Sequence, residues 1–479
     1  MSISGLLFLI ITQFLTGRGL LYLFRIEGKP VVIISLSSIL GILTFSLLPM
    51  LIDMAHIPIT RNSVVWAICG TTLLMNIFVI RRYDLSILKK LHIKLPSLPE
   101  LPFVAMLVWL MVPSVWRCFY YPPYARDVIT GPEPLAEYAI REHTINNSVF
   151  NVNILDNVAN LLKPPLITDL QIIYKLLVHP FGQLWLSILS ISFLMWLYHL
   201  LKEKLHPIVA GMVTILLLTM PELYGYTYTL LWDFSCMIMF FGGFYYLFQY
   251  ITTLQYNKFL FACLLMGFAT FIRLDSIVFI GLCTPLFLYH QLKKKVPLVR
   301  MAYSAALWLA VPLAFFYVWV GIFVKHYLPH GLNIGDDINF DSVSTYFNWI
   351  QQCNDELLFG GDNISLLGYF LYIFLLILGV DAVVFRRFSK EAVFMLLGIA
   401  IIYLGMPLLA YFTKWFNIMT AKRGYFKMFV LMTMYMRSSA LMTKISEMIK
   451  AFEKPADKTP QPKVAPVQVK TKHHKKKGK

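Results

Sequence analysis

Apolar and polar positions divide the chain into about thirteen apolar segments separated by polar connections. A helix of roughly 20 apolar residues is long enough to cross the hydrocarbon core of a bilayer. Such segments lie near 2–24, 31–53, 64–80, 101–119, 182–201, 206–221, 229–250, 259–273, 276–292, 301–324, 366–384, 392–412 and 425–443. The two-residue alternation of an outer-membrane barrel is absent, so the sequence predicts an all-α polytopic membrane protein.

Two long polar intervals interrupt this pattern. The first, at 120–180, carries Asp127 and Glu133 and later a basic-proline element, Lys163-Pro164-Pro165. We expect short amphipathic helices within this loop. The second interval, at 325–365, is polar and contains several aspartates. We interpret it as a lid or an acceptor-binding loop.

The intervals suggest four regions along the chain. Residues 1–95 form an N-terminal extension of about three transmembrane helices. Residues 96–300 form a core that includes the first polar interval, and residues 301–450 supply further transmembrane helices together with the second interval. Residues 451–479 are rich in Pro, Lys and Gln, which predicts a disordered, basic cytoplasmic tail able to contact anionic lipid.

Composition supports the membrane assignment. The 479 residues are 58% hydrophobic and 14% charged, with a mean hydropathy of +0.66, whereas soluble proteins carry roughly 25% charged residues. The net charge is +17, but the basic residues fall in short loops and in the tail, as the positive-inside rule predicts. This distribution argues against nucleic acid as a partner. The six scattered cysteines show no metal-binding spacing.

The basic loops set the expected orientation. The interval at 81–94 (RRYDLSILKKLHIK) is strongly basic and is predicted to be cytoplasmic. Basic clusters at 202–204, 293–300 and 386–390 fall on the same side when the spans are threaded in order. The loop at 120–180 then faces the extracytoplasmic side. An odd number of spans places the N-terminus outside and the C-terminus inside.

A set of charged residues falls on this outward face, where charges near the membrane are costly and usually functional. The set comprises three carboxylates and three basic side chains, namely Asp127, Glu133, Asp233, Lys163, Arg273 and Arg423. Such groups suit glycosyl transfer from a polyprenyl phosphate. One carboxylate acts as general base on the acceptor hydroxyl, and the basic groups neutralise the phosphate leaving group. A second carboxylate orients the first or shares a divalent cation with it.

Several of these residues stand in motifs that resemble type-C glycosyltransferases. EPLAEYAI (133–140), followed by KPPL (163–166), resembles the first outer loop of that superfamily, with the aminoarabinose transferase and protein O-mannosyltransferase groups as the closest patterns. Asp233 is similar in placement to the second acidic residue of the family. GFATFIR (267–273) resembles its cationic position, and RGYF (423–426) resembles its Arg-Tyr element.

The resemblance implies a fold and an activity. It implies a helix bundle with a catalytic outer loop and an inverting transferase that moves a sugar from a polyprenyl-phosphate donor to an acceptor hydroxyl on a glycan, lipid or protein. It also implies that Lys163, Arg273 and Arg423 bind the donor phosphate, and that a divalent cation, where present, is held by Glu133 and Asp233. The general base is either Glu133, which motif position favours, or Asp127. The expected location is the bacterial inner membrane, or the endoplasmic reticulum in a eukaryote.

Two other function classes remain open. A transporter or flippase of a lipid-linked anion uses similar charges along a substrate path, although the sequence shows no internal repeat of the kind that builds many transporters. A polymerase or ligase of surface polysaccharide works from lipid-diphosphate donors, and the polar interval at 325–365 is compatible with it. A nucleotide-sugar enzyme is disfavoured because no phosphate-binding glycine loop occurs.

Overall fold

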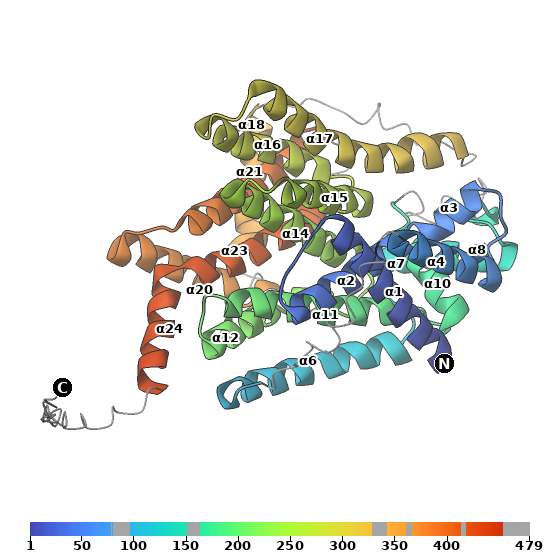
Figure 1. The fold of residues 1–479 in the computed structure, drawn as a ribbon, viewed down its shortest axis with the longest axis horizontal. Coiled ribbons are helices and arrows are strands. Elements are labelled where there is room, and N and C mark those ends of the chain that lie inside the picture. The colour runs from blue at the N-terminus through green and yellow to red at the C-terminus, as the bar shows by residue number, and fades with distance from the viewer. Residues whose placement is uncertain are drawn as a thin grey trace, which may run out of the picture.

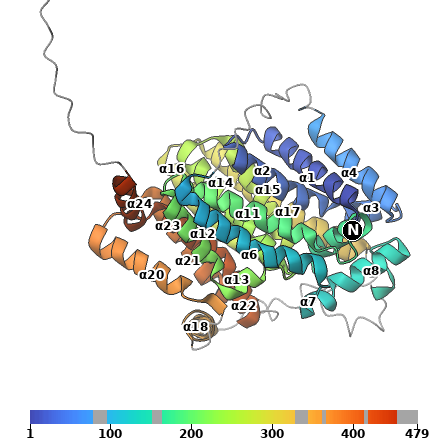
Figure 2. The ribbon, with the colours of Figure 1, turned by 90° about the horizontal axis from the view of Figure 1, so that it is seen from below.

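The computed structural model describes residues 1–77, 79, 96–150, 163–327, 343–360, 366–412 and 418–453. Within these ranges the regular structure is helical throughout and contains no strand. This confirms the prediction of an all-α protein. Most long helices run along the long axis of the molecule, with α7, α8 and α10 near one end and α24 at the other (Figures 1 and 2).

The helices up to the end of the first polar interval are α1 (Ile3–Leu23), α2 (Pro30–Phe45), α3 (Leu48–Met54), α4 (Arg61–Asn76), η2 (Leu98–Glu100), α6 (Leu101–Tyr120), α7 (Arg126–Ile129), α8 (Pro132–Glu142), η3 (Ser148–Phe150) and α10 (Leu166–Leu177). Helices α7, α8 and α10 therefore lie in the interval for which short helices were predicted. The basic loop at 81–94 lies outside the described residues.

The helices of the remaining chain are α11 (Leu184–Lys202), α12 (Pro207–Leu218), α13 (Pro221–Gly225), α14 (Trp232–Thr253), α15 (Tyr256–Ile272), α16 (Ser276–Lys293), α17 (Leu298–Tyr317), η4 (Val318–Tyr327), α18 (Val343–Cys353), η6 (Asn354–Leu358), α20 (Phe370–Val380), η7 (Asp381–Phe385), α21 (Lys390–Phe412), α22 (Ile418–Gly424), α23 (Phe426–Ser438) and α24 (Ala440–Glu453). Much of the second polar interval lies outside the described residues.

Seven helices of the described chain are long and apolar enough to cross a membrane, and three shorter apolar helices accompany them. The protein thus has the character of a multi-pass membrane protein. The predicted number of about thirteen spans is not confirmed, because several of the helices found at predicted spans are short for a bilayer. Helix α23, for example, has 13 residues, and roughly 20 are needed to cross.

Close backbone contacts join α1 to α2. A Cβ atom at Gly17 would lie 1.9 Å from the carbonyl oxygen of Ser37, and one at Gly41 would lie 1.9 Å from that of Gln13. Only glycine permits such an approach, and small residues serve the same purpose in other membrane helix pairs. The two helices therefore form a tight unit at the start of the chain.

This N-terminal unit supports α10, the last helix of the first polar interval. The Gln13 side chain of α1 exchanges hydrogen bonds with the Tyr174 hydroxyl at 3.0–3.1 Å. The backbone N–H of Met50 in α3 donates to the Asp169 carboxylate at 3.3 Å. Because Tyr174 and Asp169 are both fully buried, the N-terminal extension fixes the position of α10.

The chain changes direction at Ser439, within the span predicted at 425–443. Helix α23 ends at Ser438, Ser439 adopts an extended conformation (φ −64°, ψ 139°), and α24 begins at Ala440. The predicted span is therefore divided between two helices. Residues 451–453, which were assigned to a disordered tail, belong to α24, and residues 454–479 lie outside the described residues.

Candidate active site

The first part of the site joins the first polar interval to α22. Asp127, in the single turn of α7, forms an ion pair with Arg423, although the two residues are 296 positions apart in the chain. The Lys163 ammonium lies 3.8 Å from the same carboxylate oxygen of Asp127. One carboxylate is thus held between two cations that come from different segments.

The second part surrounds Arg273, which ends α15. Its guanidinium contacts Asp233, in the first turn of α14. It also donates a hydrogen bond of 3.2 Å to Asp275 and forms an ion-pair contact of 2.9 Å with the other oxygen of that carboxylate. Asp233 is also favourably placed because the N-terminal end of a helix attracts negative charge. The Lys427 ammonium lies 3.9 Å from Asp275. Two carboxylates and two cations therefore form a compact, mostly buried cluster.

The basic-proline element connects these two parts. The Lys163 ammonium lies 4.7 Å from the centroid of the Trp232 ring. The indole N–H of Trp232 donates to the carbonyl oxygen of Pro164 at 3.0 Å. Since Trp232 directly precedes Asp233, these contacts place Lys163 between the Asp127 pair and the Asp233 pair.

A third ion pair fixes α22 beside the site. Lys422 binds Glu222 at 2.8 Å, and the Tyr226 hydroxyl donates to the same carboxyl group at 2.9 Å. The Tyr226 ring packs against Phe426 at the start of α23. Consecutive residues of α22, Lys422 and Arg423, therefore contact carboxylates from two different parts of the chain.

Three tyrosines surround Arg117 and help to position the two segments that carry Asp127 and Asp233. The guanidinium carbon of Arg117, near the end of α6, lies 5.1–5.3 Å from the ring centroids of three tyrosines, Tyr121, Tyr124 and Tyr228. Stacking of this kind is worth about 0.5–1 kcal/mol per contact at exposed sites. The first two tyrosines precede Asp127 and the third precedes Asp233. Arg117 therefore connects the chain segments that lead to these two acidic residues.

Charge and burial act against each other on these groups. Burial raises the pKa of Asp127, but the hydrogen bond and charge of Arg423, helped by Lys163, outweigh it and hold that pKa below its usual value. Burial lowers the pKa of Lys163; Asp127 opposes this shift, and the positive charge of Arg273 adds to it. The pKa of Asp275 is likewise lowered, since Arg273 and Lys427 outweigh its burial. The carboxylates are therefore ionised at neutral pH.

Glu133 lies in a separate cluster. Its carboxylate accepts hydrogen bonds from Lys175 at 2.5 Å and from Gln171 at 2.9 Å, and Lys175 also pairs with Glu137. Lys175 is only 6% exposed, so these pairs hold α8 against α10. Of the six predicted site residues, the structure brings five together, Asp127, Lys163, Asp233, Arg273 and Arg423, and places Glu133 at the α8–α10 contact.

The predicted metal ligands do not form a metal site. Glu133 is bound by Lys175, and Asp233 is bound by Arg273. The part of the chain that the structure describes contains no group of three or more His, Cys, Asp or Glu side chains able to hold a metal ion. A cation shared by these two carboxylates does not fit the residues present.

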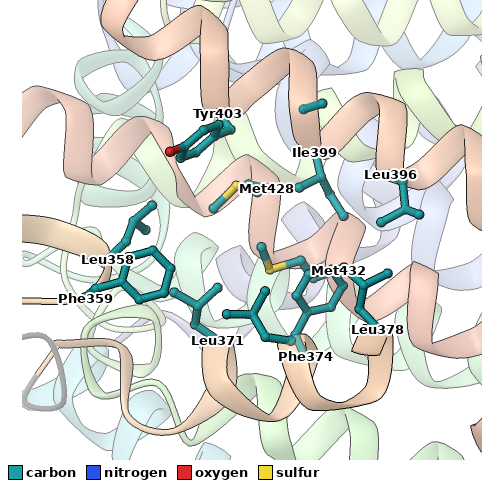
Figure 3. A pocket seen from close by; sticks show the side chains of 12 residues that line it. Leu358, Phe359, Leu371, Phe374, Leu378, Leu396, Ile399, Tyr403, Met428 and Met432 are labelled. Carbon is teal, nitrogen blue, oxygen red and sulfur yellow. The ribbon is translucent and has the colours of Figure 1, made fainter. Parts of the chain in front are cut away.

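The structure also contains an apolar pocket of about 280 Å³ (Figure 3). It is formed by η6, α20, α21 and α23, and its lining residues are Leu358, Phe359, Leu371, Phe374, Leu375, Leu378, Leu396, Ile399, Ala400, Tyr403, Met428 and Met432. Met428 directly follows Lys427 of the charged cluster. Phe359 and Leu375 are partly exposed, so part of the lining also faces the outside of the bundle.

The sequence reasoning missed Lys422, Glu222 and Tyr226, and it did not anticipate the pocket. The adjacent basic pair Lys422-Arg423 beside the last predicted span was a signal that could have included Lys422. Searches against protein-family models, curated proteins and solved structures found no match for this chain.

Proposed function

We propose that the protein is a membrane glycosyltransferase that moves a sugar from a polyprenyl-phosphate donor to an extracytoplasmic acceptor hydroxyl, with inversion at the anomeric carbon. One observation carries the proposal. Asp127, Lys163 and Arg423 meet at one point, next to the Asp233–Arg273 pair, although they come from distant segments. A carboxylate beside several cations is the combination that this reaction needs.

Asp127 serves as the general base in this mechanism. Its carboxylate takes the proton of the acceptor hydroxyl while the acceptor oxygen forms a bond to the anomeric carbon. The bond between that carbon and the donor phosphate oxygen breaks, and the electron pair leaves with the polyprenyl phosphate. Lys163 and Arg423 stabilise the negative charge that develops on the phosphate.

Side-chain exposure distinguishes the groups that we assign to contact the substrate from the ion pair that we assign to hold the site in place. The side chains of Asp127, Arg423 and Lys163 are 23%, 28% and 41% exposed. Ion pairs with this exposure are weak in water, so both cations are free to exchange Asp127 for a donor phosphate. The Asp233–Arg273 pair is 1% and 15% exposed. We assign Asp233 the role of holding Arg273 in place beside the donor phosphate.

The apolar pocket suits the first part of the polyprenyl chain. Helix α22, which carries Arg423, contacts η6 and α21, and both of these elements line the pocket. A phosphate at Arg423 then has the pocket nearby for its apolar chain. The lining is apolar apart from the Tyr403 hydroxyl, which donates to Asn354 at 2.9 Å. On this proposal the site faces outward across a bacterial inner membrane or into the endoplasmic reticulum.

The test is sugar release by the purified protein in lipid nanodiscs. We would supply a panel of radiolabelled polyprenyl-phosphate hexoses and pentoses with a mixture of glycan, lipid and peptide acceptors. The expected result is formation of free polyprenyl phosphate together with a labelled product, and its loss in Asp127→Asn. Movement of the intact donor across a proteoliposome membrane without product would instead indicate a transporter, and turnover of lipid-diphosphate donors alone would indicate a polymerase.

The pocket has a test of its own. Met432→Trp fills the pocket, and Leu376→Trp adds the same side chain to α20 at a position that is 66% exposed. We expect the first variant to raise KM for the lipid-linked donor and the second to leave it unchanged. An unchanged KM in both variants would remove the pocket from the proposal.

A further inference from the structure

Helix α24 lies across the end of the bundle. In Figure 1 it runs across the direction of α6 and α11, and in Figure 2 it is seen nearly end-on. It contacts α12, α23 and η7. A 14-residue helix in this position cannot be a membrane span, because it lies across the direction that the spans follow.

Polar contacts attach one side of α24 to the bundle. The Glu453 carboxylate lies 2.9 Å from the His206 ring, and the Ser446 hydroxyl accepts from the backbone N–H of His206 at 3.1 Å. At the other end of the helix, the backbone N–H of Leu441 donates to Asp381 at 2.9 Å. These contacts at both ends fix the helix in its transverse orientation.

A second side of α24 is apolar and uncovered within the described chain. Ile445, Met448 and Phe452 are 36%, 52% and 85% exposed. Their spacing of three and four residues places them on one face of the helix. Lys444 is exposed beside this face and lies 3.7 Å from Glu447, and Lys450 is exposed on the opposite side of the helix. An apolar face combined with a polar face that carries lysines is typical of helices that lie in a membrane interface.

The surrounding charge is basic. Helix α24 docks on His206, just after the Lys202 and Lys204 positions that the positive-inside rule assigns to the cytoplasmic side. The sequence that follows the helix, 454–479, contains nine lysines and one aspartate. Anionic lipids give the cytoplasmic leaflet a negative surface potential that attracts such segments.

We propose that α24 binds an anionic lipid surface, with Ile445, Met448 and Phe452 inserted among the acyl chains and Lys444 at the headgroups. The helix then anchors the end of the bundle opposite the charged site. A protein partner fits less well, because the exposed apolar strip is narrow and has a lysine at its edge, and lysine is depleted in protein interfaces.

The test measures how deeply single positions of α24 lie in the membrane. Cys69→Ser removes the one native cysteine of the described chain that is not buried. A nitroxide label is then attached at Met448→Cys or at Thr443→Cys. Thr443 is exposed and stands on the opposite side of the helix, which makes it the matched control. Accessibility to oxygen and to a water-soluble nickel chelate is measured in full-length protein in nanodiscs of neutral lipid or of neutral lipid with phosphatidylglycerol.

We expect the label at position 448 to be accessible to oxygen and shielded from the nickel chelate. The label at position 443 should show the reverse. Phosphatidylglycerol should deepen the position of the 448 label, and Lys444→Gln should reduce that gain. Equal nickel access at both positions would overturn the proposal, as would shielding of position 448 from both reagents, which would indicate a covering protein. The same depth in both lipids would overturn the anionic preference.

Discussion

The two candidate bases give opposite expectations when each is neutralised without a change in size. Asp127→Asn removes the carboxylate that contacts Arg423 and lies 3.8 Å from Lys163. Glu133→Gln removes the carboxylate that binds Lys175 at 2.5 Å. If the proposed mechanism holds, the first substitution abolishes turnover and leaves the fold intact. The second should weaken the fold and leave turnover nearly unchanged.

The magnitudes follow from the surroundings of each group. A positioned general base contributes roughly 10²–10⁴-fold in rate, which is about 2.7–5.4 kcal/mol at 1.36 kcal/mol per decade. The Asp127 pairs are partly exposed, so their loss should change stability by only about 0–1 kcal/mol. Glu133 binds Lys175, which is 6% exposed. Loss of one charged hydrogen bond there should cost about 1.5–3 kcal/mol, reduced because Glu137 still pairs with the lysine.

Two assays are needed on the same preparations. Release of polyprenyl phosphate from the donor gives kcat and KM, and thermal unfolding in detergent gives the relative stability. The expected pattern is a fall in kcat with an unchanged unfolding midpoint for Asp127→Asn, and the reverse for Glu133→Gln. A fall of 10²-fold or more in the Glu133 variant alone, with its midpoint unchanged, would refute the reasoning and restore Glu133 as the base.

Three further expectations concern pH, packing and buried charge. Asp127 has a lowered pKa and stays ionised as pH falls past the ordinary 3.8, so Arg423→Gln should raise that pKa and move the acid limb of the residual activity to higher pH. Gly41→Ala places a Cβ atom 1.9 Å from a carbonyl oxygen and should destabilise the protein by about 1–3 kcal/mol in thermal unfolding. Gly70→Ala, where no atom lies within 4 Å, should be neutral or stabilise by up to about 1 kcal/mol. Glu391→Gln removes one of the two carboxylates that pair with the buried Arg437 and should cost about 1.5–3 kcal/mol in the same assay, because Glu203 still binds the arginine.

The positions of the helices follow from the sequence because apolar runs of bilayer length leave few alternatives. The bends within those runs were not predicted. The run near 31–53 contains a break between α2 and α3, and Pro49 in the first turn of α3 was a local signal for it. The break at Ser439 has no proline beside it, and only the short polar run Arg437-Ser438-Ser439 marks it. It depends on contacts of α24 with residues far away in the chain.

The sequence predicted which residue types occur at the site better than it predicted which of these residues lie together. Motif position favoured Glu133, but the partner of a carboxylate is set by tertiary packing. Lys175 lies on α10, which the N-terminal helices hold in place through Tyr174 and Asp169. No local pattern indicates that this lysine reaches Glu133. The pairing of Asp127 with Arg423 likewise depends on the packing of the whole bundle.

Helix α23 connects two ionic clusters. Its 13 residues span about 20 Å. At one end, Lys427 faces the charged site. At the other end, Arg437 binds Glu203 at 2.7 Å and also pairs with Glu391, and Arg437 and Glu391 are 5% and 4% exposed.

Breaking a buried pair of this kind costs several kcal/mol, whereas partly exposed pairs such as Asp127–Arg423 contribute little to folding. The buried cluster therefore holds α23 in place. The partly exposed Asp127–Arg423 pair contributes little to stability, so its charges remain available to a substrate. The pocket wall formed by Met428 and Met432 lies on α23 between Lys427 and Arg437, so it keeps a fixed position relative to both.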